Sequence, residues 1–320
     1  MSPSRVSLHA PDSLIPNLAM MKLSAWHRQQ GDDVWINTRL ADPTSDLIYV
    51  SYVFTNSVRD HDERATVGGI GTDNRQAKLS EQAEHILPDY DAWGCGYSMG
   101  LTSRGCPNSC PWCFVPEAEG KIVDYADPDS FVRVDHDHVM LLDNNLLAAP
   151  GAVRVLEWAG RFHGSVDFNT GLDTRRIDRA TAKLLSKVKI RPWIRLACDS
   201  EAGKKPLVKA MANLESAGIA VGQRRTVVCV LVGFSGELSE EDIERTKFVD
   251  GIADAFVMPY MPPDAGPGWR PDERIRAFAR WCNRKEFSRT VAWEDYDHGY
   301  GKEKVRQRRI GPDGPELPFK

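Results

Sequence analysis

Short apolar runs alternate with amphipathic stretches along the chain from about residue 90 onward. The runs are rich in Val, Leu and Ile, or are short and apolar, as strands buried on both faces of a sheet tend to be. The six expected strands are residues 97–102, 139–142, 165–169, 193–198, 226–232 and 255–258. Helical spacing lies between them, at 153–161, 178–187, 205–217 and 239–248. This alternation predicts parallel βα units.

Six such units predict an α/β fold in which a parallel sheet curls into a partial, TIM-like (β/α)6 barrel. The reactive end of such a barrel is the carboxyl-terminal edge of its strands. The first 90 residues predict a separate, smaller unit, with strands at 7–9, 34–36, 47–54 and 67–71 and a helix at 16–30. This order is typical of a small three-layer α/β domain that is Rossmann-like.

We therefore expect three parts in the chain. The first is a small domain at 1–90, the second a core barrel at 91–285 and the third a C-terminal extension at 286–320. Pro88 to Tyr90 is the expected linker between the first two. The extension contains the dense basic stretch 302–309, which we expect to be a solvated tail.

Composition changes this picture little. Hydrophobic residues make up 42% and charged residues 27% of the chain, which is ordinary for a globular protein. A formal net charge of -4 gives no global basic field of the kind that indicates nucleic-acid binding. The N-terminus lacks a signal-peptide pattern, and no apolar stretch approaches the roughly 20 residues that cross a bilayer. We expect a cytoplasmic protein without membrane contact.

Candidate chemistry is concentrated in the cysteines. The chain has seven, and an odd number argues against a disulfide framework. Cys106, Cys110 and Cys113 have the spacing Cys-x-x-x-Cys-x-x-Cys. Three thiolates can bind three irons of a four-iron cluster and leave the fourth iron open. The alternative is structural zinc, for which this spacing is a poor pattern and which needs a fourth ligand, such as Cys95 or His136.

The cysteine spacing resembles that of the radical S-adenosylmethionine (SAM) superfamily. Trp112 fills the aromatic position before the last cysteine that this family favours. Gly105 before the first cysteine and the segment 115–120 are similar to the region around the cluster in methylthiotransferases and in cobalamin-binding radical SAM enzymes. The resemblance covers about residues 97–260. It implies a 4Fe–4S cluster whose open iron binds SAM, reductive cleavage to a 5′-deoxyadenosyl radical, and a reducing partner such as flavodoxin or ferredoxin. The substrate, small or macromolecular, and the catalytic residues stay unassigned.

The resemblance also implies SAM contacts at the ends of successive strands. Asn145 matches the last residue of the methylthiotransferase motif Leu-Leu-Gly-Gln-Asn, whereas the two residues before it depart from that motif. Alternatives exist for these positions: turn chemistry after the second strand, a helix cap at Asp199 and a plain tight turn at Gly233. The candidate SAM-binding residues are Trp112, Asp143, Asn144, Asn145, Asn169, Asp199, Ser200 and Gly233.

The N-terminal unit resembles a shortened cobalamin-binding domain. The helix at 16–30 and the Gly68-Gly69 turn carry this resemblance, but the cobalt-ligating motif Asp-x-His-x-x-Gly is absent. We expect the unit to act as a lid or docking surface rather than as a cobalamin carrier. Two alternatives stay open: a cobalamin-dependent radical SAM methyltransferase, and a zinc-stabilised protein whose basic tail contacts nucleic acid.

Overall fold

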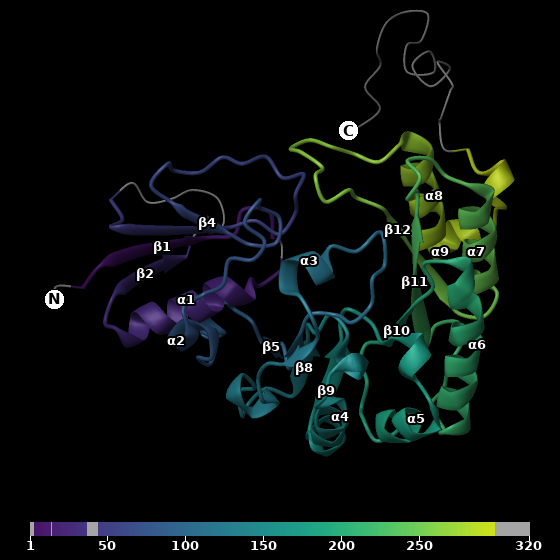
Figure 1. Cartoon of the computed structure of the whole chain (residues 1–320), viewed down its shortest axis with the longest axis horizontal. Coiled ribbons are helices and arrows are strands. Elements are labelled where there is room, and N and C mark those ends of the chain that lie inside the picture. Colours follow the sequence, from purple (N-terminus) through teal and green to yellow (C-terminus); the bar gives the residue numbers. More distant parts are fainter. Residues whose placement is uncertain (1–2, 14, 37–43, 298–320) are drawn as a thin grey trace, which may run out of the picture.

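The computed structural model describes residues 3–13, 15–36 and 44–297 (Figure 1). The basic stretch 302–309, and with it most of the expected C-terminal extension, lies outside these residues. Within them, no helix combines the length and the apolar character needed to span a membrane.

The N-terminal unit is built on a parallel four-stranded sheet with the order β2-β1-β3-β4. Its strands are β1 (Arg5–His9), β2 (Asp33–Ile36), β3 (Leu47–Ser51) and β4 (Thr66–Gly68). Helix α1 (Leu18–Gln29) packs Met20 and Leu23 against the apolar side chains of β1. Asn17 caps this helix by accepting a hydrogen bond from the Met20 amide at 3.2 Å. Every element predicted for this unit is therefore confirmed.

The expected three-layer arrangement is wrong for the described residues. Helix α1 and the short helix α2 (Glu81–Glu84) contact each other and lie on the same side of the sheet (Figure 1). The connection at residues 52–65 forms no helix, because it is polar and lacks apolar residues at helical spacing. Its turns are held by Asp12, whose carboxylate accepts from the backbone amides of Val53 and Phe54.

The second part contains all six predicted strands, and their observed ends differ from the predicted ones by at most two residues. They form two parallel sheets, β5-β8-β9 and β10-β11-β12. The strands are β5 (Ser98–Gly100), β8 (His138–Leu141), β9 (Ser165–Phe168), β10 (Ile194–Ala197), β11 (Thr226–Val232) and β12 (Asp254–Pro259). The architecture is thus mixed α/β with parallel sheets.

Strand pairing is interrupted between β9 and β10, where the sequence predicts one continuous sheet. Single bridges join Val166 to Ile190 and Leu172 to Leu196. Pro192 lies between the two partner positions, and proline has no backbone N–H to continue a ladder. The two sheets therefore follow one another in the predicted strand order without forming a single ladder.

Helices cover one face of these sheets. The predicted helices are present as α4 (Ala152–Arg161), α5 (Arg179–Leu185), α6 (Glu201–Ser216) and α7 (Glu240–Asp250). The core between them and the strands includes Val228, Val230 and Val232, which alternate with half-buried residues along β11. Among the described residues, the remaining helices and strands are α3 (Val115–Glu119), α8 (Glu273–Asn283), α9 (Lys285–Ser288), β6 (Ser103–Arg104) and β7 (Val123–Asp124). Short 3-10 turns lie at Asp91–Trp93, Pro128–Ser130, Leu146–Ala148, Thr174–Arg176 and Trp293–Asp295.

The expected linker is a packed junction. Tyr90 is 1% exposed, and its hydroxyl donates to the Phe131 carbonyl at 2.6 Å and accepts from the Met99 amide at 3.1 Å. Asp89 pairs with Arg28 of α1 at 3.0 Å. Residues 88–90 thus tie α1 to the start of β5.

Candidate functional site

The three cysteines of the predicted cluster line a single cavity of about 440 Å³. Cys106, Cys110 and Cys113 lie on the loop that follows β6 and leads into α3. The opposite walls come from residues at the carboxyl ends of the strands: Asn144, Asn145, Thr170, Asp173, Asp199, Ser200, Leu231 and Met258. The cavity therefore lies at the strand edge where the sequence places the reactive end.

Backbone geometry fixes the start of the cysteine loop. Gly105 has φ +81°, and a Cβ at this position would lie 2.4 Å from the Lys121 carbonyl oxygen. A glycine is required there by both the backbone conformation and the close approach. The next residue, Cys106, donates its amide to the Gly120 carbonyl at 3.3 Å. The chain on either side of α3 is thus held together at the base of the loop.

Glu119 joins this loop to the strand edge. Its carboxylate accepts from the Gly105 amide at 3.1 Å and from Asn144 Nδ2 at 2.7 Å, and it pairs with Arg104 at 3.3 Å. Charge-assisted hydrogen bonds of this kind are stronger than neutral ones. One carboxylate therefore orders the cysteine loop, the end of α3 and the segment after β8.

Asp143 binds the chain segment just before the cysteine loop and does not line the cavity. The residue is 2% exposed, and one carboxylate oxygen accepts from the amides and hydroxyls of Thr102 and Ser103 at 2.5–3.0 Å. Burial raises the pKa of Asp143. Its contacts hold the chain that enters β6, so the structure places Asp143 apart from the other candidate SAM ligands.

Asn145 faces the cysteines directly. Its amide nitrogen lies 3.5 Å from Cys106 Sγ and donates to Asp173 Oδ2 at 3.1 Å. The acceptor on Asp173 fixes the orientation of the amide, which leaves Asn145 Oδ1 buried with no partner among the described residues. Buried acceptors are nearly always satisfied in folded proteins. An unsatisfied one beside a cavity fits a ligand that brings a hydrogen-bond donor.

Three residues of this wall were not singled out from the sequence: Asn108, Asp173 and Arg175. Asp173 accepts from Asn108 at 3.2 Å and from Arg175 at 2.8 and 2.9 Å. Although burial opposes it, hydrogen bonds from Arg175, Asn145 and Asn108 hold the pKa of Asp173 below its usual value. In the segment 169–173 after β9, Asp173 lines the cavity, whereas the predicted residue Asn169 does not.

Asp199 and Ser200 both line the cavity. Helix α6 starts with Ser200 as its N-cap, and Asp199 instead accepts from the Leu231 amide at 3.0 Å. The helix-cap alternative for Asp199 is therefore wrong. Burial raises the pKa of Asp199. The Asp199 carboxylate thus accepts from a β11 amide at a point where β10 has already ended, and it also lines the cavity.

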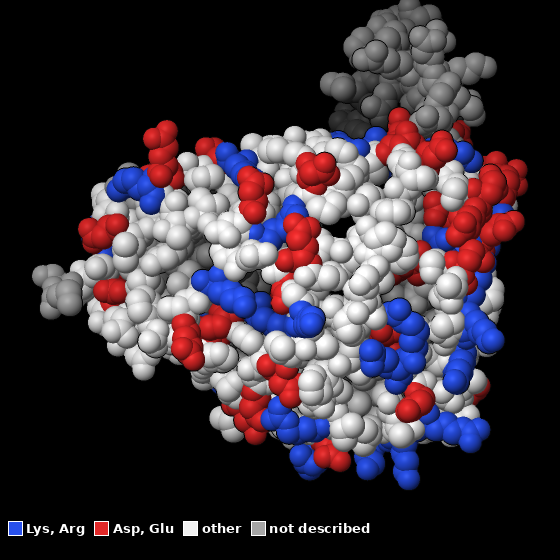
Figure 2. All heavy atoms as spheres, viewed as in Figure 1, with Lys and Arg blue, Asp and Glu red and all other residues white. Residues whose placement is uncertain are grey.

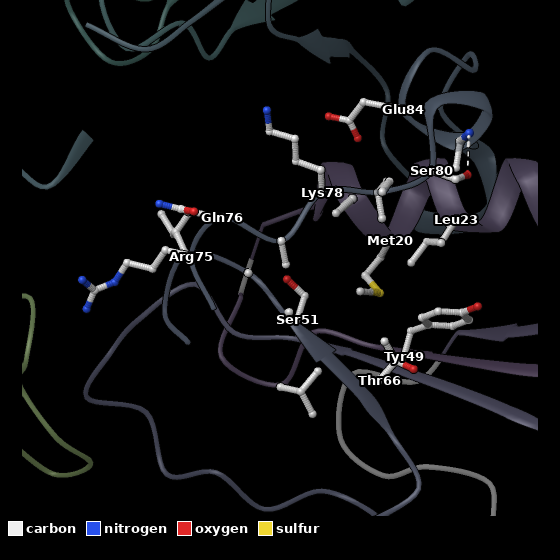
Figure 3. A pocket seen from close by; sticks show the side chains of 18 of the residues that line it. Met20, Leu23, Tyr49, Ser51, Thr66, Arg75, Gln76, Lys78, Ser80 and Glu84 are labelled. Atoms are coloured by element: carbon white, nitrogen blue, oxygen red, sulfur yellow. Dashed lines mark hydrogen bonds between the residues drawn. The ribbon is translucent and has the colours of Figure 1, made fainter. Parts of the chain in front are cut away.

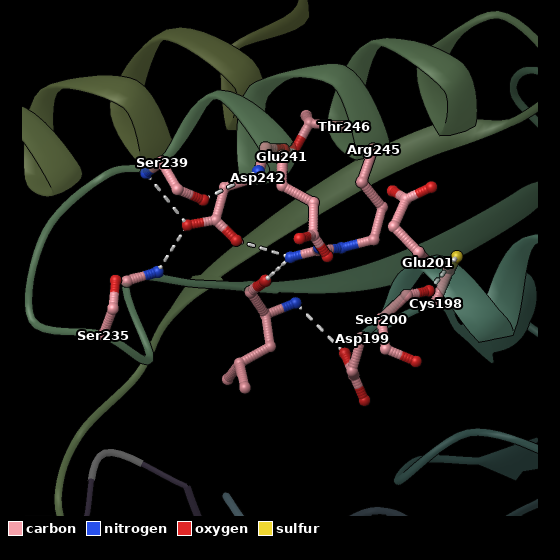
Figure 4. A network of polar contacts seen from close by, with 12 residues as sticks. Cys198, Asp199, Ser200, Glu201, Ser235, Ser239, Glu241, Asp242, Arg245 and Thr246 are labelled. Carbon is pink, nitrogen blue, oxygen red and sulfur yellow. Dashed lines mark hydrogen bonds and ion pairs between the residues drawn. The ribbon is translucent and has the colours of Figure 1, made fainter.

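A buried ion pair supports the end of β11 behind Asp199 (Figure 4). Arg245 donates to the Leu231 carbonyl at 2.7 Å and pairs with Asp242 at 2.6 Å. The other oxygen of Asp242 accepts from the Gly233 amide at 3.1 Å. Two charged residues of α7 thus fix the backbone on both sides of Val232.

Gly233 does not line the cavity. It has φ +75°, and a Cβ there would lie 2.4 Å from Ile275 Cδ1 of α8. A glycine is required there by the backbone conformation and by the packing against α8. These requirements agree with the alternative interpretation of Gly233 as part of a tight turn. Trp112 does line the cavity, and its ring meets Phe234 edge-on at 5.9 Å, which in turn meets Tyr260 at 4.9 Å.

The named candidates for a fourth zinc ligand lie elsewhere. Cys95 donates to the Tyr97 carbonyl at 3.1 Å, and His136 contacts Ser98 Oγ at 3.0 Å. Both precede the strands whose carboxyl ends form the cavity, and neither lines it. Within the described ranges, no three His, Cys, Asp or Glu side chains are arranged to hold one metal ion. A four-iron cluster binds each thiolate to a different iron, so its ligands need not converge on one point.

The comparisons with known proteins agree with the resemblance seen in the sequence. No family model matches the chain. It is 24% identical over 231 residues to a tRNA-2-methylthio-N(6)-dimethylallyladenosine synthase of Streptomyces viridosporus, which covers 62% of this chain and 45% of that protein. The synthase of the same name from Streptomyces coelicolor is 25% identical over 201 residues, covering 54% and 39%. The chain thus spans less than half the length of these relatives.

Among solved structures, a spore photoproduct lyase variant with bound AdoMet and a dinucleoside spore photoproduct covers 85% of both chains at 13% identity, with a TM-score of 0.34. That score is below the level at which two chains share a fold. The similarity to the synthases therefore carries the comparison, and it supports the resemblance to the radical SAM superfamily that the cysteine spacing indicates.

Proposed function

We propose that this chain is a radical SAM enzyme that holds a 4Fe–4S cluster on Cys106, Cys110 and Cys113. The observation that carries the proposal is that these three thiols line one cavity together with polar groups from successive strand ends. The buried, unsatisfied Asn145 Oδ1 fits a cationic donor such as the ammonium of SAM. When bound, the cluster supplies the electron that cleaves SAM to a 5′-deoxyadenosyl radical.

Roles for the cavity residues follow from their contacts. Asn145 would accept from the SAM amino group, and Asp199 would accept from a hydroxyl or amine through its second oxygen. The Trp112 backbone would contact the adenine. A volume of about 440 Å³ is within the range of small-molecule sites. In this proposal the six strands form the partial barrel that brings their ends to one mouth.

The division into a domain at 1–90 and a core at 91–285 belongs to the same proposal, with the N-terminal unit acting as a lid. Contacts between the unit and the segment after β12 support this role. Asn56 accepts from the Gly268 amide at 2.9 Å and donates to the Trp269 carbonyl at 3.1 Å, and Arg75 donates to the Pro263 carbonyl. A lid at the mouth would exclude water from a reactive intermediate.

Replacing Asn145 or Asp199 with alanine should weaken SAM binding about five- to tenfold each, because each change removes one polar contact. The cluster should remain, since neither residue is among its ligands. Binding of radiolabelled SAM to the anaerobic, reconstituted protein measures the effect. Asn169→Ala is the matched control: it changes the same residue type outside the cavity and should leave binding unchanged. Unaltered affinity in both cavity variants would remove these residues from the site.

The lid role predicts that the N-terminal unit does not retain cobalamin. Its cavity, described below, has about 410 Å³, and a corrinoid is larger than the molecules that cavities of this size enclose. After incubation with hydroxocobalamin and desalting, the protein should show no corrinoid absorbance. Stoichiometric retention would instead favour the cobalamin-dependent methyltransferase.

A further inference from the structure

The N-terminal unit contains a second cavity, of about 410 Å³, between helix α1 and the strands β3 and β4 (Figure 3). The helix contributes Met20, Leu23 and Trp26, and the sheet contributes Tyr49 and Val67. A slot between a helix and a sheet has two roughly parallel walls, and its aromatic side chains favour stacking against a flat apolar group. Methionine adapts its shape to such a group.

The segment 75–80 closes one side of this cavity. Of the cationic side chains that line the cavity, some have hydrogen-bond or ion-pair partners among the described residues and one has none. Arg75 donates to the Pro263 carbonyl. Arg104, at the far wall, is neutralised by Glu84 at 2.5 Å and Glu119 at 3.3 Å. Lys78 has no hydrogen-bond or ion-pair partner in the part of the chain that the structure describes. The cavity therefore has mostly apolar walls and one lysine, Lys78, whose charge is not paired with another described residue.

Charged side chains of both signs lie around this cavity. Figure 2 shows Lys and Arg side chains at the centre of the face, where the N-terminal unit meets the rest of the chain, with Asp and Glu side chains among them. Figure 3 shows the side chains of Lys78 and Glu84 on the same side of the cavity. Lys22 lies behind Glu84, 4.0 Å from its carboxylate, so this acid is balanced by cations already present. An incoming anion would meet Lys78 without competing with a free carboxylate.

We propose that this cavity binds a small molecule with a flat apolar body and one anionic group, a carboxylate or a phosphate. The body would lie between α1 and the sheet, and the anion would pair with Lys78. This site is separate from the cysteine cavity and goes beyond the proposed function. The two cavities are connected through Glu119, which lines the second cavity with Arg104 and Ala118 and accepts hydrogen bonds from the Gly105 amide and from Asn144, a residue that lines the cysteine cavity.

A matched pair of probes tests the proposal on the full-length protein. 8-Anilinonaphthalene-1-sulfonate carries the anion, and N-phenyl-1-naphthylamine has the same rings without it. Both should bind with rising fluorescence, the sulfonate at one molecule per chain. Lys78→Gln should weaken the sulfonate about three- to tenfold and leave the neutral probe within about twofold. A loss that is equal for the two probes, or no binding of the sulfonate to the unchanged protein, would overturn the proposal.

Two filling variants locate the bound probes. Thr66→Trp and Ala19→Phe each place a ring in the cavity from a position that is not fully buried, so the core of the unit should survive. Both should abolish binding of either probe. Val208→Trp on the exposed face of α6 is the control and should bind both normally. Undiminished binding by the two filling variants, with thermal unfolding like that of the unchanged protein, would place the probes elsewhere and contradict the site.

Discussion

Cys110→Ala should remove the broad visible absorbance of the anaerobically reconstituted protein and abolish SAM cleavage. The loss should be complete, because two remaining thiolates cannot hold a cluster that needs three and keeps its fourth iron open. The same result is expected for Cys106→Ala and Cys113→Ala. Iron and sulfide counts on each purified variant measure it. A full four-iron complement in any of the three would show that its thiol is not a ligand.

The protein contains its own controls for this experiment. Cys198 and Cys282 are buried in the main core, and burial raises the pKa of the first to about 11 and of the second to about 12. Thiols in such surroundings stay protonated and behave as small apolar side chains. Cys198→Ala and Cys282→Ala should therefore keep full iron and sulfide content, with at most a modest loss of stability.

Arg245→Met should lower the free energy of unfolding by about 3–5 kcal/mol. The side chain of Arg245 is 4% exposed, and its removal would leave the buried Asp242 carboxylate without a counter-charge and the Leu231 carbonyl without its donor. Because Asp242 also accepts from the Gly233 amide, the end of β11 should loosen. Urea unfolding followed by circular dichroism measures the loss.

A surface ion pair between the same helix and the 3-10 turn Trp293–Asp295 provides the comparison. Lys247 pairs with Glu294 at 2.6 Å, and both side chains are about half exposed. Lys247→Met should cost less than about 1 kcal/mol, since exposed ion pairs contribute little. Replacing both members of the buried pair, as in Arg245→Met with Asp242→Leu, should recover part of the loss. Equal losses for Arg245→Met and Lys247→Met would show that the buried network does not stabilise the fold.

The strands and the cysteine loop could be predicted because their signals are local. The strand predicted at 226–232 is continuously apolar from Val227 to Val232, and the observed β11 has the predicted bounds. Helix α8 carries an equally local signal, with Ile275, Phe278, Ala279 and Cys282 at helical spacing, and could have been predicted. The break between β9 and β10 depends on the pairing position of Pro192, which is a tertiary property.

The site was predicted in part for a similar reason. Strand ends can be located from the sequence, and Asn145, Asp199 and Trp112 all line the cavity. Which polar residue after a strand turns inward depends on contacts that the sequence does not display. Asp143 is held by Thr102 and Ser103, and Asp173 is held by residues of three different segments. The contacts of Arg245 likewise join α7 to the end of β11, and they could not be predicted from the sequence because they link separate elements.

The most direct test of the cluster assignment is formation of 5′-deoxyadenosine. The anaerobically reconstituted protein is mixed with SAM and dithionite, and the products are separated by chromatography. We expect 5′-deoxyadenosine from the unchanged protein and from Cys198→Ala, and none from Cys110→Ala. Protein that holds four irons and four sulfides per chain, binds SAM and still yields no 5′-deoxyadenosine would contradict the account.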